Sequence, residues 1–93
     1  MMSSAIEGLT RALAIELAPV RVNCVAPGTV HTEMWDRVLD PAARDAYFSQ
    51  AASTLPAGRI GRPEDIATAI LALLQNPFAT GSLVRIDGGA MLV

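Results

Sequence analysis

Two short segments rich in β-branched residues constrain this chain most. Residues 20–26 read Val-Arg-Val-Asn-Cys-Val-Ala and are closed by Pro27 and Gly28, whereas residues 82–87 read Ser-Leu-Val-Arg-Ile-Asp and are closed by two glycines. Such runs, ended by turn residues, predict strands. A helical pattern lies between them, as parallel strands require for their long crossover connection. We therefore expect the two strands to be parallel neighbours in one sheet.

Three helical segments complete the expected order of elements. The first begins near Ser4, because Glu7 three residues later fits a capping box, and Pro19 ends it. The second spans residues 42–52, with Asp40 as N-cap before a proline at the first helical position. The third begins at Pro63. Apolar residues recur in it at helical spacing and form its expected buried face: Ile66, Ala69, Ile70, Leu73 and Leu74.

Composition excludes several classes of function. Hydrophobic residues make up 52% of the 93 residues and charged residues 17%, against about 25% charged in an average domain. All the basic residues are arginine and the net charge is −2, so the chain has neither a basic field for nucleic acid nor a lysine for Schiff-base chemistry. One cysteine and one histidine make neither an internal disulfide nor a Cys/His zinc site. No apolar run is long enough to span a membrane. Together with the single thiol, this predicts a cytoplasmic protein without a membrane or nucleic-acid partner.

Five segments of the chain match, in sequence order, the motifs of a known family: residues 7–14, 21–28, 58–67, 80–82 and 87–89. Together they resemble the short-chain dehydrogenase/reductase family. The resemblance implies a C-terminal portion of a doubly wound, Rossmann-type α/β fold, with two parallel strands and their helices. By this resemblance, residues 1–93 are a single C-terminal segment of the family's Rossmann domain, and an irregular substrate-loop insert occupies about residues 29–54. The resemblance also implies an oxidoreductase that moves a hydride between NAD or NADP and a carbonyl or alcohol.

The resemblance assigns half of a nicotinamide site to the segment after the first strand. By resemblance, Pro27, Gly28, Val30 and Thr32 are the cofactor-binding residues. The backbone near Val30 would bond the nicotinamide carboxamide, and the Thr32 hydroxyl would reach the carboxamide or the pyrophosphate. The position fits the rule that ligands bind beyond the carboxyl ends of parallel strands. The simpler interpretation is that Pro27 and Gly28 form a turn and that Thr32 caps a helix.

The insert also resembles the family's substrate-covering segment. Met34, Trp35 and Tyr47, with Phe48 beside them, are its expected substrate-loop residues. The aspartates of the insert have neither EF-hand nor helical spacing, so we expect solvated side chains and no metal site. Cys24 lies in the middle of a strand, where we expect a small buried hydrophobic residue.

No catalytic residue can be assigned. The family's glycine-rich phosphate turn, catalytic serine and Tyr-x-x-x-Lys pair have no counterpart in this sequence. The lysine position falls at Ser3 and the tyrosine position before Met1, while Tyr47 is followed four residues later by Ala51. In the family a lysine charge lowers the pKa of the tyrosine, and this chain has no lysine. Two interpretations remain: a portion of a reductase that is inactive alone, or a stand-alone oligomeric interaction module without activity.

We also expect a homo-oligomer. The first strand lacks the neighbour that the family places beside it, so its edge is a template for another chain. A two-stranded sheet is marginally stable by itself, and a chain this poor in charge would expose large apolar patches. Two-fold pairing of this edge would be antiparallel.

Overall fold

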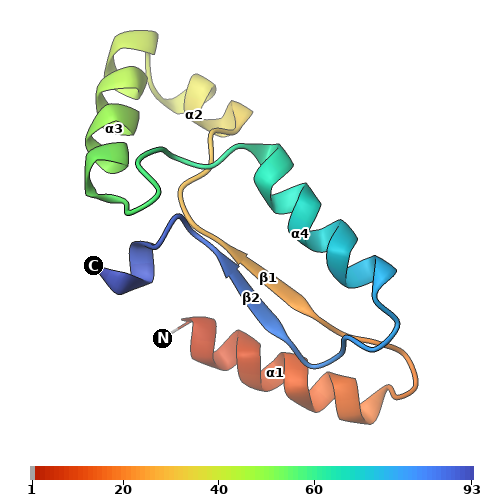
Figure 1. Ribbon diagram of the computed structural model, residues 1–93. Helices are drawn as coiled ribbons and strands as arrows, with labels where there is room; N and C mark the ends of the chain where they lie inside the picture. Colours follow the sequence, from red (N-terminus) through yellow and green to blue (C-terminus); the bar gives the residue numbers. More distant parts are fainter. Residues whose placement is uncertain (1) are drawn as a thin grey trace.

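A two-stranded sheet lies between two helices, and two further helices continue beyond one end of it (Figure 1). The computed structural model describes residues 2–93, with side chains from residue 4 onward. Along the chain, the elements are α1 (Met2–Glu16), β1 (Cys24–Pro27), α2 (Glu33–Val38), α3 (Pro41–Thr54), α4 (Pro63–Gln75), β2 (Leu83–Ile86) and a 3₁₀ helix, η1 (Ala90–Leu92).

The predicted parallel pairing is confirmed. Cys24 lies opposite Leu83, and Pro27 lies opposite Ile86. Both strands are shorter than residues 20–26 and 82–87, and β1 ends at Pro27 rather than before it. The early part of the first segment is held by a loop instead of by the sheet. There the Val22 N–H donates to the Thr80 hydroxyl at 3.2 Å, and the Val22 carbonyl accepts from Gly81.

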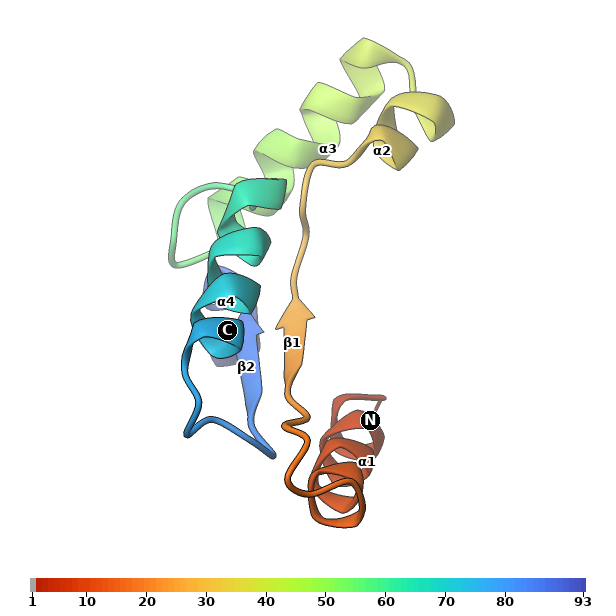
Figure 2. The ribbon, with the colours of Figure 1, turned by 90° about the vertical axis from the view of Figure 1, so that its right-hand side faces the viewer.

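Helices α1 and α4 cover opposite faces of the sheet (Figure 2). Among the described side chains of α1, that of Thr10 is the most buried, and its hydroxyl donates to the Ile6 carbonyl at 2.7 Å. Ser4 is not the N-cap that we expected, because α1 begins at Met2. Glu7 does not complete a capping box either, since its carboxylate pairs with Arg11 one turn later at 2.7 Å.

Helix α4 begins at Pro63 as predicted, with acidic residues in its first turn. The predicted buried face is only partly correct. Ile66, Ala69 and Leu73 are half-buried, but Ile70 and Leu74 are 44% and 63% exposed. The two exposed residues lie toward the free edge of β1, where the described residues supply no covering strand.

The insert is more regular than expected, since two helices, α2 and α3, fill it. The prediction that Asp40 caps α3 is confirmed, because its carboxylate accepts from the Ala43 N–H at 2.7 Å. The short helix α2 was not predicted, because six residues carry too few turns for a visible apolar period. No helix among residues 2–93 is both long and apolar enough to cross a bilayer.

The sheet is tied to the end of α4 by Arg21. Its guanidinium donates to the carbonyls of Leu73 and Leu74 at 2.8 and 2.9 Å. These carbonyls belong to the last turn of α4, where helices leave acceptors unsatisfied and where a positive charge is favourable. Asn23 extends the attachment, since its side-chain amide donates to the Ala79 carbonyl and accepts from the Ser82 N–H. Two side chains of the first strand segment therefore fix the path from α4 into β2.

We expect Arg21→Met to destabilise the chain by about 1–3 kcal/mol, since the charged hydrogen bonds to the carbonyls at the end of α4 are lost while the aliphatic stem is kept. Arg21→Lys should lose less stability than Arg21→Met, because an ammonium group still reaches some of these carbonyls. Arg37→Met is the matched control: Arg37 is 80% exposed in a 3.6 Å pair with Glu33 and should change stability by less than about 0.5 kcal/mol. Urea unfolding at one fixed protein concentration measures all three, and equal losses for Arg21→Met and Arg37→Met would contradict the role of Arg21.

The start of α4 is held by an ion pair between Arg59 and Asp65. The guanidinium contacts both carboxylate oxygens, at 2.8 and 3.1 Å. Asp65 also accepts from the Arg62 N–H at 2.7 Å, which is half of a capping box. The hydrogen bond from Arg59, and next the one from the Arg62 backbone, lower the pKa of Asp65 to about 2.

Because this pKa is lower in the folded state, the contribution of Asp65 to stability is present above its unfolded pKa of about 3.9 and is lost as the pH falls toward 2. We expect Arg59→Gln to raise the pKa of Asp65 toward the ordinary range. A carbon-13 NMR titration of the Asp65 carboxyl measures this shift. An unchanged midpoint in Arg59→Gln would show that the ion pair does not form in solution.

Candidate functional site

The chain leaves the carboxyl end of β1 without a hydrogen-bonded turn at Pro27 and Gly28, and it bends at Thr29. The Gly28 N–H donates to the Ile86 carbonyl at 3.0 Å, which continues the ladder by one residue beyond the strand. The predicted turn at Pro27 and Gly28 is therefore wrong. Gly28 is needed for a different reason: a Cβ at this position would lie 2.8 Å from the Asp87 Cα. The segments around Gly28 and Asp87 approach each other so closely that no side chain fits at position 28.

The next residues are held against the loop that precedes α4. Val30 forms an isolated parallel bridge with Gly61. The Gly61 N–H donates to the Thr29 carbonyl at 2.8 Å, and the Gly61 carbonyl accepts from the His31 N–H at 3.0 Å. A Cβ on Gly61 would approach the Val30 Cγ2 to 3.2 Å, so a glycine favours this contact. The segment after β1 is thus fixed on both sides, by β2 at Gly28 and by Gly61 at Val30.

This attachment leaves two polar groups of the segment without partners among residues 2–93. In a parallel bridge the bonded groups belong to the residues on either side of Val30, so its own N–H points away from Gly61. No described residue accepts from that N–H. Thr32 is the N-cap residue of α2, as the simpler interpretation held, but its side chain makes no capping bond. The Thr32 side chain is exposed, so its hydroxyl is available to a ligand.

The expected substrate-loop residues are only partly brought together. Trp35 stacks on Tyr47, with ring centroids 4.9 Å apart, and meets Phe48 edge-on at 5.8 Å. The indole N–H of Trp35 donates to the Val30 carbonyl at 3.0 Å, which ties α2 back to the segment after β1. Met34 lies outside this aromatic cluster and is 58% exposed. Tyr47 lies in α3 and packs against Trp35 and Phe48.

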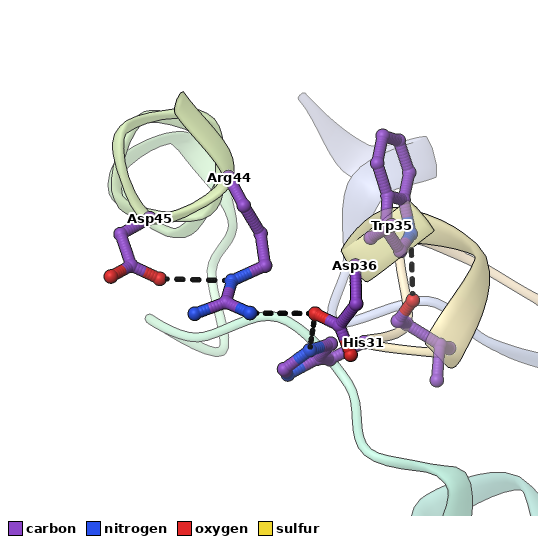
Figure 3. Close-up of polar contacts among 6 residues, drawn as sticks. His31, Trp35, Asp36, Arg44 and Asp45 are labelled. Carbon is purple, nitrogen blue, oxygen red and sulfur yellow. Dashed lines mark hydrogen bonds and ion pairs between the residues drawn. The ribbon is translucent and has the colours of Figure 1, made fainter. Parts of the chain in front are cut away.

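A charged cluster that the sequence did not reveal joins α2 to α3 (Figure 3). Asp36 accepts from the Arg44 guanidinium at 2.6 Å and lies 3.2 Å from the His31 imidazole. Arg44 also contacts Asp45 at 3.1 Å. The Arg44 hydrogen bond, with a smaller one from His31, lowers the pKa of Asp36. Because Asp36 and Arg44 lie eight positions apart on different helices, no helical or strand spacing marks the pair.

The aspartates of the insert serve local structure. Asp36 and Asp45 pair with Arg44, and Asp40 caps α3. Within the described part of the chain, no three acidic, histidine or cysteine side chains gather in a way that could hold a metal ion. Cys24 is half-buried and free, so the expectation of a fully buried thiol is wrong, because no strand covers the outer edge of β1 among these residues.

A small cavity lies at the carboxyl ends of both strands. Its volume is about 190 Å³, below the range of about 300–1,000 Å³ typical of ligand pockets. The walls come from the segment after β1, the loop before α4 and the end of β2: Thr29, Leu55, Ala57, Arg59, Gly61, Asp65, Ile86, Asp87 and Gly88. These residues can contact one end of a dinucleotide but cannot enclose it. Ser3, which occupies the position of the family's catalytic lysine, lies outside the described side chains.

The chain is similar to reductases and dehydrogenases over nearly its whole length. A family model described as enoyl-(acyl carrier protein) reductase matches residues 1–91. Carbonyl reductase family member 4 of Danio rerio is 42% identical over 90 residues, which cover 95% of this chain and 35% of that protein. The (2S)-[(R)-hydroxy(phenyl)methyl]succinyl-CoA dehydrogenase subunit BbsD of Thauera aromatica is 45% identical over 89 residues, or 91% of this chain and 34% of that protein.

Solved structures give the same result. A small-chain dehydrogenase in complex with NADPH superimposes with a TM-score of 0.88 and 43% identity, covering 97% of this chain and 41% of that one. The MalC reductase/Diels-Alderase of Malbranchea aurantiaca gives 0.87 at 34% identity, over 97% of this chain and 34% of that one. The chain spans about a third of the length of the curated relatives that it matches. Its two parallel strands and flanking helices are part of a Rossmann-type α/β fold, and the chain belongs to the short-chain dehydrogenase/reductase family.

Proposed function

We propose that this chain supplies the nicotinamide side of an NAD(P)-dependent oxidoreductase and does not catalyse a reaction by itself. The observation that carries the proposal is the segment after β1, which is held by Ile86 and Gly61 while the Val30 N–H and the Thr32 hydroxyl keep no partner among residues 2–93. The family membership supplies the cofactor class, since one solved relative holds NADPH. When bound, that cofactor supplies or accepts the hydride.

The available groups fit a carboxamide. A primary amide offers one carbonyl acceptor and two N–H donors. The Val30 N–H can donate to that carbonyl, and the Thr32 hydroxyl can accept from the amide or donate to a phosphate oxygen. Both groups belong to residues that the chain already positions, so little ordering would oppose their use. Gly28 contributes through its close approach to Asp87, which sets the direction in which the segment leaves the sheet.

The α2–α3 insert would act as a preformed wall beside this segment. Trp35 anchors α2 through the Val30 carbonyl, and its ring packs between the helices on Tyr47. The Asp36–Arg44 pair adds a second attachment between the same two helices. We assign these residues to positioning, whereas the exposed Met34 is the side chain of the insert that could contact a substrate directly.

We expect the purified 93-residue chain to show no turnover of NADH or NADPH with a panel of ketones. A family-type mechanism needs a tyrosine whose pKa is lowered by a neighbouring lysine, and the chain contains no lysine. Absorbance at 340 nm against a heat-treated sample measures the rate. Turnover clearly above that control would contradict the proposal and would require a different acid–base group.

The binding role can be tested in a chimera. In the small-chain dehydrogenase that was solved with NADPH, the part that this chain matches is replaced by this chain. The match covers 97% of this chain and 41% of the dehydrogenase. Loss of one neutral hydrogen bond is worth about 0.5–1.5 kcal/mol, so Thr32→Val should weaken NADPH binding by roughly two- to tenfold. Thr68→Val is the matched control, because the Thr68 hydroxyl donates to Glu64 within α4. Nicotinamide fluorescence measures both, and equal affinities in a folded chimera would remove Thr32 from the site.

A second candidate, a stand-alone interaction module, is favoured by one observation. No hydrophobic side chain among those described is fully buried, as would suit a chain that completes its core with a partner. The two candidates differ in the chimera: an interaction module has no need to restore NADPH binding there, whereas the nicotinamide portion of a reductase must do so.

A further inference from the structure

The α2–α3 insert contacts the segment after β1 at two consecutive residues, Val30 and His31. The Trp35 indole N–H donates to the Val30 carbonyl at 3.0 Å. The His31 imidazole lies 3.2 Å from Asp36 and packs at a tilt on the Phe48 ring, with ring centroids 4.8 Å apart. Both contacted residues lie in the segment that carries the groups proposed to bind nicotinamide.

The bond from Trp35 lies on the same side of this segment as the free Val30 N–H. Thr29 and His31, on either side of Val30, are the residues that bond to Gly61. In such a bridge both the N–H and the C=O of Val30 point away from Gly61. The indole occupies that carbonyl, whereas the N–H beside it has no acceptor among the described residues. One side chain of α2 therefore holds the backbone of the residue whose N–H is proposed to bind the cofactor.

The placement of Trp35 is itself set by α3. Its ring stacks on Tyr47, with centroids 4.9 Å apart, and meets Phe48 edge-on at 5.8 Å. The neighbouring Asp36 accepts from Arg44 of α3 at 2.6 Å (Figure 3). A helix of six residues is too short to be stable by itself. Helix α2 therefore depends on α3 for its placement, and the segment after β1 depends on α2 through Trp35.

The Trp35 bond is the strongest of the links between the insert and the segment. The His31 and Asp36 side chains are 43% and 45% exposed, and exposed charged pairs contribute little to stability. The bond from Trp35 to Val30 is partly buried. The Trp35 ring also has two aromatic neighbours, and such contacts contribute more than their buried area alone. Trp35 therefore provides most of the coupling between the two parts.

We propose that Trp35 is a positioning residue: through the Val30 carbonyl it makes the affinity for a nicotinamide cofactor depend on the placement of α2 and α3. The insert then does more than form a wall beside the site, and this role rests on the proposed function of the Val30 N–H. A substrate that contacts the exposed Met34, the neighbour of Trp35 in α2, would change the cofactor affinity as well. By linkage, the cofactor would change the affinity for that substrate by the same factor.

Trp35→Phe in the NADPH-binding chimera tests this role. Phenylalanine keeps an aromatic ring against Tyr47 but has no N–H to donate. We expect the NADPH affinity to fall roughly two- to tenfold, which is the effect of one lost hydrogen bond, with an unchanged far-ultraviolet circular dichroism spectrum. Arg37→Gln is the matched control and should leave the affinity unchanged, because Arg37 is 80% exposed on the same helix and pairs with Glu33 there.

The outcomes separate this role from the proposed function. If Thr32→Val weakens NADPH binding and Trp35→Phe does not, Trp35 has no positioning role, although the nicotinamide site stands. If Trp35→Phe weakens binding and Thr32→Val does not, the coupling is supported and Thr32 is removed from the site. Equal weakening by Trp35→Phe and Arg37→Gln means that the effect is not specific to the bond with Val30, and it overturns the proposal.

Hydrogen exchange measured by NMR needs no cofactor. In the 93-residue chain, Trp35→Phe should speed exchange of the His31 N–H by roughly threefold or more, because local opening of the segment breaks the bond from that N–H to Gly61. The Gly28 N–H, which donates to Ile86 beside the sheet, is the internal reference and should keep its rate. An unchanged rate at His31 overturns the proposal. An equal increase at Gly28 does so too, since it indicates a general loss of stability.

Discussion

The parallel contact between β1 and β2 is the constraint on which the other parts of the structure depend. Each strand has only four residues, so the pairing alone is weak. The chain extends it at both ends. Before β1, Arg21 and Asn23 bind carbonyls at and beyond the end of α4. After β1, Gly28 continues the ladder against Ile86. The strands stay aligned because side chains and a glycine outside them hold both ends.

This alignment determines where the candidate site lies. The segment after β1 cannot swing away from the sheet, since Gly28 approaches Asp87 and Val30 is bridged to Gly61. Gly61 in turn is placed by the start of α4, which Asp65 fixes through Arg59 and the Arg62 N–H. The contacts thus run from the ion pair at α4 to the Val30 N–H. Substitutions at Arg59 could therefore alter the segment after β1 without touching it.

Sequence alone was sufficient for features that depend on local chemistry. The β-branched runs located both strands, and the proline and aspartate signals placed the starts of α3 and α4. It failed where a residue serves a tertiary contact. Gly28 resembles a turn residue, but its small size is used against Asp87. Glu7 resembles half of a capping box, but Arg11 competes for it. The Asp36–Arg44 pair joins two helices whose relative placement no periodicity encodes.

The apolar pattern of α4 misled the prediction for a different physical reason. Helical spacing shows which residues form one face, but it does not show whether a single chain can cover that face. Ile66 and Leu73 pack near the sheet, whereas Ile70 and Leu74 of the same face remain exposed beside the open edge of β1. The groups that position Val30 and Thr32 lie within this chain, while the surface that would complete its core does not. Local order at the site therefore does not depend on a fully buried core, since the contacts that hold Gly28 and Val30 all lie among the described residues.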